Sequence, residues 1–154
     1  MRTTLCLLAT ALFASSACGG GAAEPPPFKP VVDTLLLMEA VVDPSADVIW
    51  DSVGTIITAE GEEHIRPKND EEWMAVRNAA VAVAESGNLL MMSPRAVDAE
   101  WVRISQAMVD TGARAIQAAE AQNVDQVFDV GGEIYAVCTN CHSKYVDAIT
   151  QANQ

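Results

Sequence analysis

The sequence has few basic residues, few aromatic residues and few cysteines. Nine Lys and Arg stand against 21 Asp and Glu, which gives a formal net charge of −12 at pH 7. A surface with this excess of negative charge repels the phosphate backbone, so the composition argues against a nucleic acid partner. It fits a basic protein partner or simple solubility better.

Long hydrophobic runs are also absent once the first residues are passed. One apolar run lies at residues 5–14, directly after the positive charge of Arg2 and a short polar stretch. It is about half as long as a membrane-spanning helix needs to be. Small residues follow at positions 15–18. This order predicts a secretory signal peptide over residues 1–17 and export from a bacterial cytoplasm.

The end of this predicted signal, "FASSACGGG", resembles the signal of a bacterial lipoprotein. Ser16, Ala17 and Cys18 match the pattern, and Ser15 stands where leucine is usual. The resemblance implies a lipid on the Cys18 sulfur and a periplasmic, membrane-anchored protein, with the outer membrane favoured. Ordinary signal cleavage that leaves a free thiol is the alternative. Residues 18–30 are rich in Gly and Pro and predict a flexible tether.

Residues 31–154 predict a single all-α domain, an antiparallel four-helix bundle. Apolar residues recur at spacings of three and four, and no stretch shows the alternation of a sheet. Asp43-Pro44 predicts a kink or a break in the first helix. Residues 58–70 predict a loop that ends at a helix cap, Asn69 or Asp70.

The positions expected to face inward are Leu35, Met38, Val42, Ile49, Val53, Ile56 and Ile57 in the first helix; Trp73, Val76, Ala80, Val83 and Leu90 in the second; Trp101, Ile104, Met108, Ala115 and Ala119 in the third; and Val127, Ile134, Cys138, Cys141, His142, Tyr145 and Ile149 in the last.

Small residues and caps add detail to this prediction. Gly112 in the third helix permits close approach of a neighbouring helix or of a flat ligand. Asn123 predicts the cap of the last helix. The pair Gly131-Gly132 predicts either a start or bend of that helix or a close approach of another backbone.

The segment "CTNCHSKY" carries the clearest chemical signal. A structural zinc site needs four ligands, and this domain offers Cys138, Cys141, His142 and the distant His64. A thioredoxin-like pair needs its first cysteine at a helix N-terminus, whereas Cys138 lies inside a predicted helix. Covalent attachment of haem needs two thiols three residues apart and a histidine on the same helix face, which this spacing provides. We therefore predict one covalently bound haem c.

A helical domain that ends in C-x-x-C-H with an aromatic residue three positions later resembles the cytochrome c′ family. The resemblance implies thioether bonds at Cys138 and Cys141 and His142 as the proximal iron ligand. That family commonly has a basic residue where this chain has Val146. It also implies that a first-helix residue faces the iron from the other side, and Met38 is the candidate.

Two functions follow from the sixth iron position. Ligation by Met38 gives a six-coordinate iron of raised potential, suited to a monohaem electron carrier that exchanges single electrons with redox partner proteins and catalyses no reaction of its own. If Met38 is a core residue instead, an open position lined by Leu35, Met38 and Val42 suits a sensor or scavenger of NO or CO. Met108 is the next candidate ligand, and His64 is a distant third. The sequence leaves open whether two copies pair through their first helices.

Overall fold

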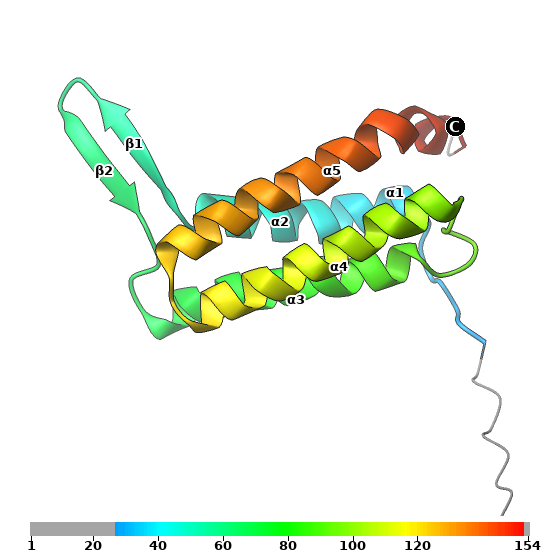
Figure 1. Cartoon of the computed structure of the whole chain (residues 1–154), viewed down its shortest axis with the longest axis horizontal. Coiled ribbons are helices and arrows are strands. Elements are labelled where there is room, and N and C mark those ends of the chain that lie inside the picture. The colour runs from blue at the N-terminus through cyan, green and yellow to red at the C-terminus, as the bar shows by residue number, and fades with distance from the viewer. Residues whose placement is uncertain (1–26, 153–154) are drawn as a thin grey trace, which may run out of the picture.

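The computed structural model describes residues 27–152 and is mostly helical, with one small sheet (Figure 1). The elements in chain order are α1 (Thr34–Leu37), the π-helix η1 (Met38–Val42), α2 (Asp43–Asp51), β1 (Gly54–Thr58), β2 (Gly61–Ile65), α3 (Asp70–Leu90), α4 (Ala99–Glu120) and α5 (Val124–Ala152). The first three run on as one helical segment, so four segments pack side by side around a shared core. The predicted signal peptide and Cys18 lie outside the described residues, and residues 27–29 of the predicted tether are exposed.

The first helical segment contains the irregularity that Asp43-Pro44 predicted. Pro44 has no N–H, and its ring would clash with the carbonyl four residues earlier in a regular α-helix. One turn of π-helix precedes it, in which the Asp43 N–H donates to the Met38 carbonyl. This wider turn lets the helix continue through the proline. Turns of this kind are rare and are often found at functional sites.

The prediction of a helical stripe through Ile56 and Ile57, followed by a loop, was wrong. These residues belong to β1, which pairs antiparallel with β2 through a tight turn at Thr58 and Gly61. A run of β-branched residues between two glycines favours a strand, and Gly61 has a φ of +142°, which suits glycine. The alternation was hidden because β1 is apolar or Thr on both faces and β2 is largely polar on both. Ile57 is 74% exposed.

Helix starts agree with the predicted caps. Asn69 accepts a hydrogen bond from the Glu72 N–H, and Asn123 accepts one from the Gln126 N–H. Asp98 does the same for Trp101 at the start of α4. Each cap satisfies one of the main-chain donors that the first turn of a helix leaves unpaired.

The core contains nearly all the apolar positions predicted for α3 and α4. Trp73, Val76, Ala80, Val83, Leu90, Trp101, Ile104, Met108, Ala115 and Ala119 are all buried. The predicted close approach at Gly112 is confirmed: a Cβ placed there would lie 2.7 Å from Ala84 Cα. The helices α3 and α4 therefore pack closely against each other at this point. None of the helices within residues 27–152 is long and apolar enough to cross a bilayer.

Gly131 and Gly132 do not start the last helix, because α5 runs unbroken from Val124 to Ala152. A side chain rather than a backbone comes close at this place. The indole of Trp50 donates to the Gly131 carbonyl at 2.9 Å, and a Cβ on Gly131 would lie 3.3 Å from Trp50 Cδ1. Gly131 thus makes room for the ring that joins α2 to α5.

Candidate functional site

A large cavity lies between the first helical segment, α4 and the C-terminal half of α5. Its volume is about 780 Å³, within the range of about 300–1,000 Å³ that is usual for small-molecule and cofactor sites. Its walls are mainly apolar, with Leu35 and Val42 on one side and Leu90 and Ile104 on another. A flat, largely apolar ligand fits such a lining.

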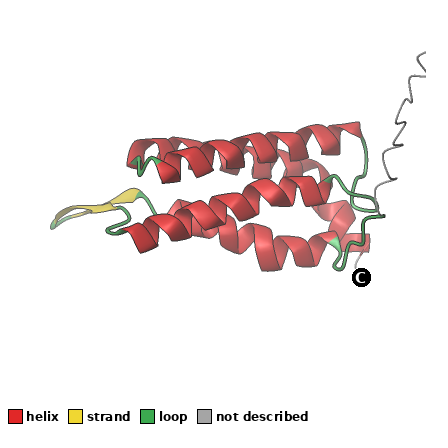
Figure 2. Cartoon of the chain, turned by 90° about the horizontal axis from the view of Figure 1, so that it is seen from below, coloured by secondary structure: helices red, strands yellow, loops and turns green. Residues whose placement is uncertain are grey.

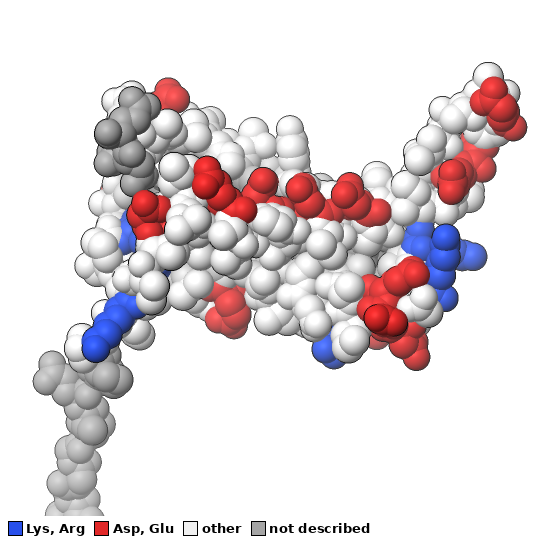
Figure 3. All heavy atoms as spheres, turned by 180° about the vertical axis from the view of Figure 1, so that it is seen from behind, with Lys and Arg blue, Asp and Glu red and all other residues white. Residues whose placement is uncertain are grey.

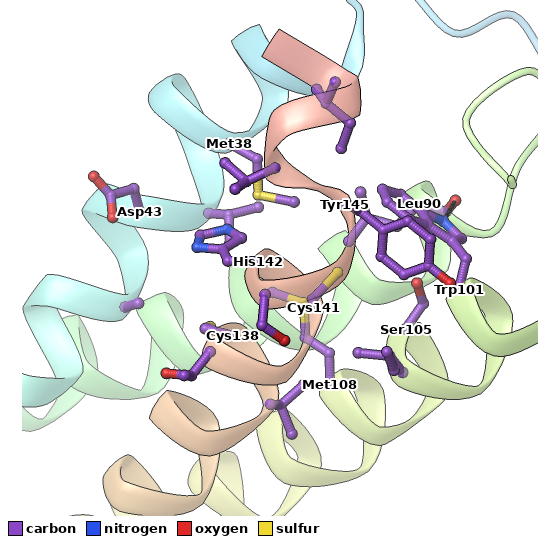
Figure 4. Close-up of a pocket in the computed structure, with 18 of the residues that line it drawn as sticks. Met38, Asp43, Leu90, Trp101, Ser105, Met108, Cys138, Cys141, His142 and Tyr145 are labelled. Atoms are coloured by element: carbon purple, nitrogen blue, oxygen red, sulfur yellow. Dashed lines mark hydrogen bonds between the residues drawn. The ribbon is translucent and has the colours of Figure 1, made fainter. Parts of the chain in front are cut away.

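Cys138, Cys141 and His142 all line this cavity from α5 (Figure 4). Residues three and four positions apart lie on one face of a helix, so the motif presents its two thiols and its imidazole to the same space. Both cysteines are half-buried and free, whereas His142 is exposed on the protein surface. The imidazole is therefore reachable without any movement of the helices.

Met38 lines the same cavity from the opposite helical segment. It is half-buried and is the first residue of the π turn. Figure 4 shows Met38 and His142 among the side chains that line this cavity. The tertiary fold thus brings Met38 to the same cavity as the motif, from which about a hundred positions separate it in the sequence. Met108 also lines the cavity, from α4, and is buried.

His64 does not line the cavity. It lies in β2 rather than in the loop that was predicted, and it is exposed beside Thr55, with Thr55 Oγ1 and His64 Nδ1 3.1 Å apart. Within residues 27–152 no cluster of three or more His, Cys, Asp or Glu side chains could hold a metal ion. The donors of the cavity are instead two thiols, one imidazole and thioethers, a set that suits a covalently attached iron porphyrin.

The surroundings of the two thiols disfavour their thiolate forms. Burial raises the pKa of Cys138, and the neighbouring Cys141 and Asp43 raise it further. Burial also raises the pKa of Cys141. A dithiol that exchanges disulfides needs the opposite shift and a position at a helix N-terminus. Both cysteines lie in the middle of α5, so the geometry argues against thioredoxin-like chemistry.

One end of the cavity is closed by Trp101 and Tyr145, whose rings pack edge to face with their centres 5.1 Å apart. The Trp101 indole donates to the Leu90 carbonyl at 2.8 Å. The Tyr145 hydroxyl donates to Asp98 at 2.8 Å, and desolvation together with this bond raises the pKa of Tyr145 to about 12. These contacts hold α5 against the start of α4 close to His142. Sequence reasoning did not single out Asp98, either as a helix cap or as the partner of Tyr145, which lies 47 positions away.

The charged groups on the cavity wall are all acidic. Within the described residues no Lys or Arg lines it, whereas Glu39 and Asp43 do. Lys144 lies near the motif in sequence, but its ammonium pairs with Glu100 on α4. Any anionic part of a bound ligand therefore finds no positive partner in the cavity wall and is directed towards solvent.

Comparison of the chain with protein-family models, with curated proteins and with solved structures gives no match. The case for a function therefore depends on the motif, the cavity and the residues that face each other across it.

Proposed function

We propose that the chain is a monohaem c-type cytochrome that carries single electrons. Cys138 and Cys141 would bind the haem through two thioethers, and His142 would be the proximal iron ligand. The observation that carries this proposal is the position of all three residues on one helix face at the wall of an apolar cavity of about 780 Å³.

The residues around the motif would have three different roles in holding the haem. Apolar side chains from the first helical segment and α4 line much of the cavity and would pack against the porphyrin. Met38 and His142 would bind the iron from different helices. Tyr145 and Trp101 hold the helix that carries His142 in place. When bound, the haem iron supplies one reversible electron, at a potential that methionine ligation raises.

We further propose that the four helical segments form an antiparallel bundle of the cytochrome c′ type. The short connections at residues 91–98 and 121–123 and a C-terminal motif helix support it. The hairpin of β1 and β2 and the absence of a basic residue at Val146 are departures from the family pattern that was expected. Residues 1–17 would act as a signal peptide that directs export. A lipid on Cys18 would then anchor the domain on the periplasmic side of a bacterial membrane. Its partners there would be redox proteins.

A visible absorption spectrum of the full chain, exported from a bacterium that has haem-maturation machinery, tests the proposal. We expect a sharp low-spin spectrum, oxidised and reduced, that CO does not change. Haem should remain with the protein after denaturation, and the double variant Cys138→Ser with Cys141→Ser should lose it. A mature chain without a Soret band would contradict the proposal.

The role of Met38 has its own test. A weak sulfur-to-iron band at the red end of the spectrum should disappear in Met38→Leu. Met74→Leu is the matched control, because Met74 is an exposed methionine on α3, outside the cavity. Loss of the band in Met108→Leu instead would assign the ligand to α4.

A gas-binding function is the second candidate, and the same wall supports it. Leu35 and Val42 line the cavity beside Met38, so a methionine that does not bind iron would leave an apolar open position. In that case the spectrum is broad and high-spin, and it shifts when CO is added. That result would replace electron transfer with NO or CO binding as the proposed function.

A further inference from the structure

The hairpin of β1 and β2 extends beyond the end of the helices as an arm (Figures 1 and 2). Within residues 27–152 no helix makes more than marginal contact with it. A two-stranded ribbon without a further strand or a packed layer is only marginally stable in water. Its outer edges also present unpaired main-chain donors and acceptors. The arm therefore has the features of a segment that another chain completes.

The two edges of the arm differ in how well they are protected. Edge strands usually carry charges or prolines that discourage pairing. The β2 edge carries the adjacent exposed residues Glu62 and Glu63. The β1 edge, Gly54–Thr58, has neither charge nor proline, and its Ile56 and Ile57 are 47% and 74% exposed. The β1 edge is thus the one that is open to a partner strand.

The arm is acidic towards its tip and basic at its base. Its outer part carries Glu60, Glu62 and Glu63 and no Lys or Arg, whereas Arg66 and Lys68 follow at its base. All five side chains are exposed. Seen from behind, acidic atoms cover the outer arm and basic atoms lie where it joins the helices (Figure 3). Two such arms laid antiparallel bring each acidic tip towards the basic base of the other.

We propose that β1 pairs antiparallel with β1 of a second copy, so that two arms form a four-stranded sheet about a two-fold axis. The simplest symmetric register sets Ile56 opposite its own counterpart and Gly54 opposite Thr58. The Glu62 and Glu63 side chains then lie on the outer strands, three strand spacings or about 14 Å apart. That exceeds the screening length of about 8 Å at physiological salt. Pairing through β2 would instead bring these carboxylates side by side.

Sedimentation velocity over a concentration series tests this dimer, using the full chain with Cys18→Ser so that no lipid associates it. We expect a reversible monomer–dimer equilibrium. Ile57→Lys places a charge on the open edge of both copies and should raise the dimer dissociation constant by roughly tenfold or more. Val97→Lys is the matched control, because Val97 is an exposed apolar residue that lies outside the arm. It should change the constant by about twofold or less.

A charge exchange distinguishes this interface from a dimer through the helices. Glu60→Lys alone and the double variant Arg66→Glu with Lys68→Glu alone should each dimerise more weakly than the parent chain. A mixture of the two should recover a mixed dimer, because each altered tip then meets a complementary base. A chain that stays monomeric at every concentration, or a dimer that Ile57→Lys leaves unchanged, would overturn the proposal.

Discussion

If haem occupies the cavity, Glu39 and Asp43 are the residues whose charge most directly affects its reduction potential. Both line it, and no Lys or Arg in the described part of the chain does so. Negative charge close to an iron centre stabilises the ferric over the ferrous state, and more strongly in a partly dehydrated site than in water. The field of Asp43 already reaches the motif, since it contributes to the raised pKa of Cys138.

We predict that Glu39→Gln and Asp43→Asn each raise the midpoint potential of the haem, measured by spectro-electrochemical titration. Asp47→Asn and Asp51→Asn are the matched controls, because these exposed carboxylates continue the same helix but do not line the cavity. Equal shifts in the four variants would mean that net charge, and not the cavity wall, sets the potential.

Individual residues differed in how well the sequence predicted them. The caps Asn69 and Asn123 follow from local hydrogen bonding and were predicted from three-residue spacings. The bond from Tyr145 to Asp98 joins residues 47 positions apart. No local pattern encodes such a contact, because it depends on how α5 lies against α4.

At the scale of elements, two helical glycines, Gly112 and Gly132, differ in how much space surrounds them. A Cβ on Gly112 would lie 2.7 Å from the backbone of Ala84, whereas a Cβ on Gly132 would have no atom within 4 Å. Both residues lie inside long helices, α4 and α5. The same substitution should therefore have opposite effects at the two sites.

We predict that Gly112→Ala lowers the free energy of unfolding by about 1–3 kcal/mol, because α3 and α4 must move apart. Gly132→Ala should raise it by about 0.5–1 kcal/mol, because alanine favours the helix and nothing obstructs its methyl group. Urea denaturation followed by circular dichroism measures both. A stabilising Gly112→Ala would show that the contact between α3 and α4 is looser than described.

The contact between α4 and α5 depends on Glu100, which pairs with Arg103 on its own helix and with Lys144 on α5. Hydrogen bonds from Arg103 and Lys144 lower the pKa of Glu100 from its ordinary value of 4.5 to about 2. A carboxyl group whose pKa is lowered by folding stabilises the fold while it is ionised. Its contribution is therefore complete above pH 4.5 and is lost as the pH falls towards 2.

We predict that the parent chain loses thermal stability between pH 4.5 and 2 more steeply than Glu100→Gln does. Asp110→Asn is the control for the loss of one exposed negative charge from α4. Within residues 27–152 the Asp110 carboxylate forms no side-chain ion pair. Parallel pH profiles for Glu100→Gln and the parent would mean that this ion-pair network contributes nothing to stability.

For the whole molecule, uneven charge is the dominant electrostatic feature. Residues 31–65 contain eight Asp and Glu and no Lys or Arg. Four of them, Glu39, Asp43, Asp47 and Asp51, recur every four residues and are exposed. A row of acidic side chains crosses the face on which α1 and α2 lie (Figure 3). Each pair of like charges four residues apart destabilises a helix by about 0.2–0.5 kcal/mol.

We predict that raising the salt concentration from about 10 mM to about 150 mM increases the midpoint of thermal unfolding, because the screening length falls from about 30 Å to about 8 Å. Asp47→Lys should reduce this salt dependence, since it replaces two repulsive pairs by two attractive ones. A midpoint that falls with salt would show that attractive ion pairs outweigh the repulsion.

The sequence by itself determined the helical character, the core of α3 and α4, the helix caps and the spacing of Cys138, Cys141 and His142, because each depends on interactions within a few turns of one helix. Tertiary structure decided the rest. It brought Met38 to the cavity opposite His142, joined Tyr145 to Asp98 and placed two carboxylates in the cavity wall. It also turned Ile56 and Ile57 into a projecting strand, where β-branched residues favoured pairing with β2 over one more helical turn. Contacts between distant segments depend on how whole elements pack against each other, and the spacing of residues within one segment does not determine this packing.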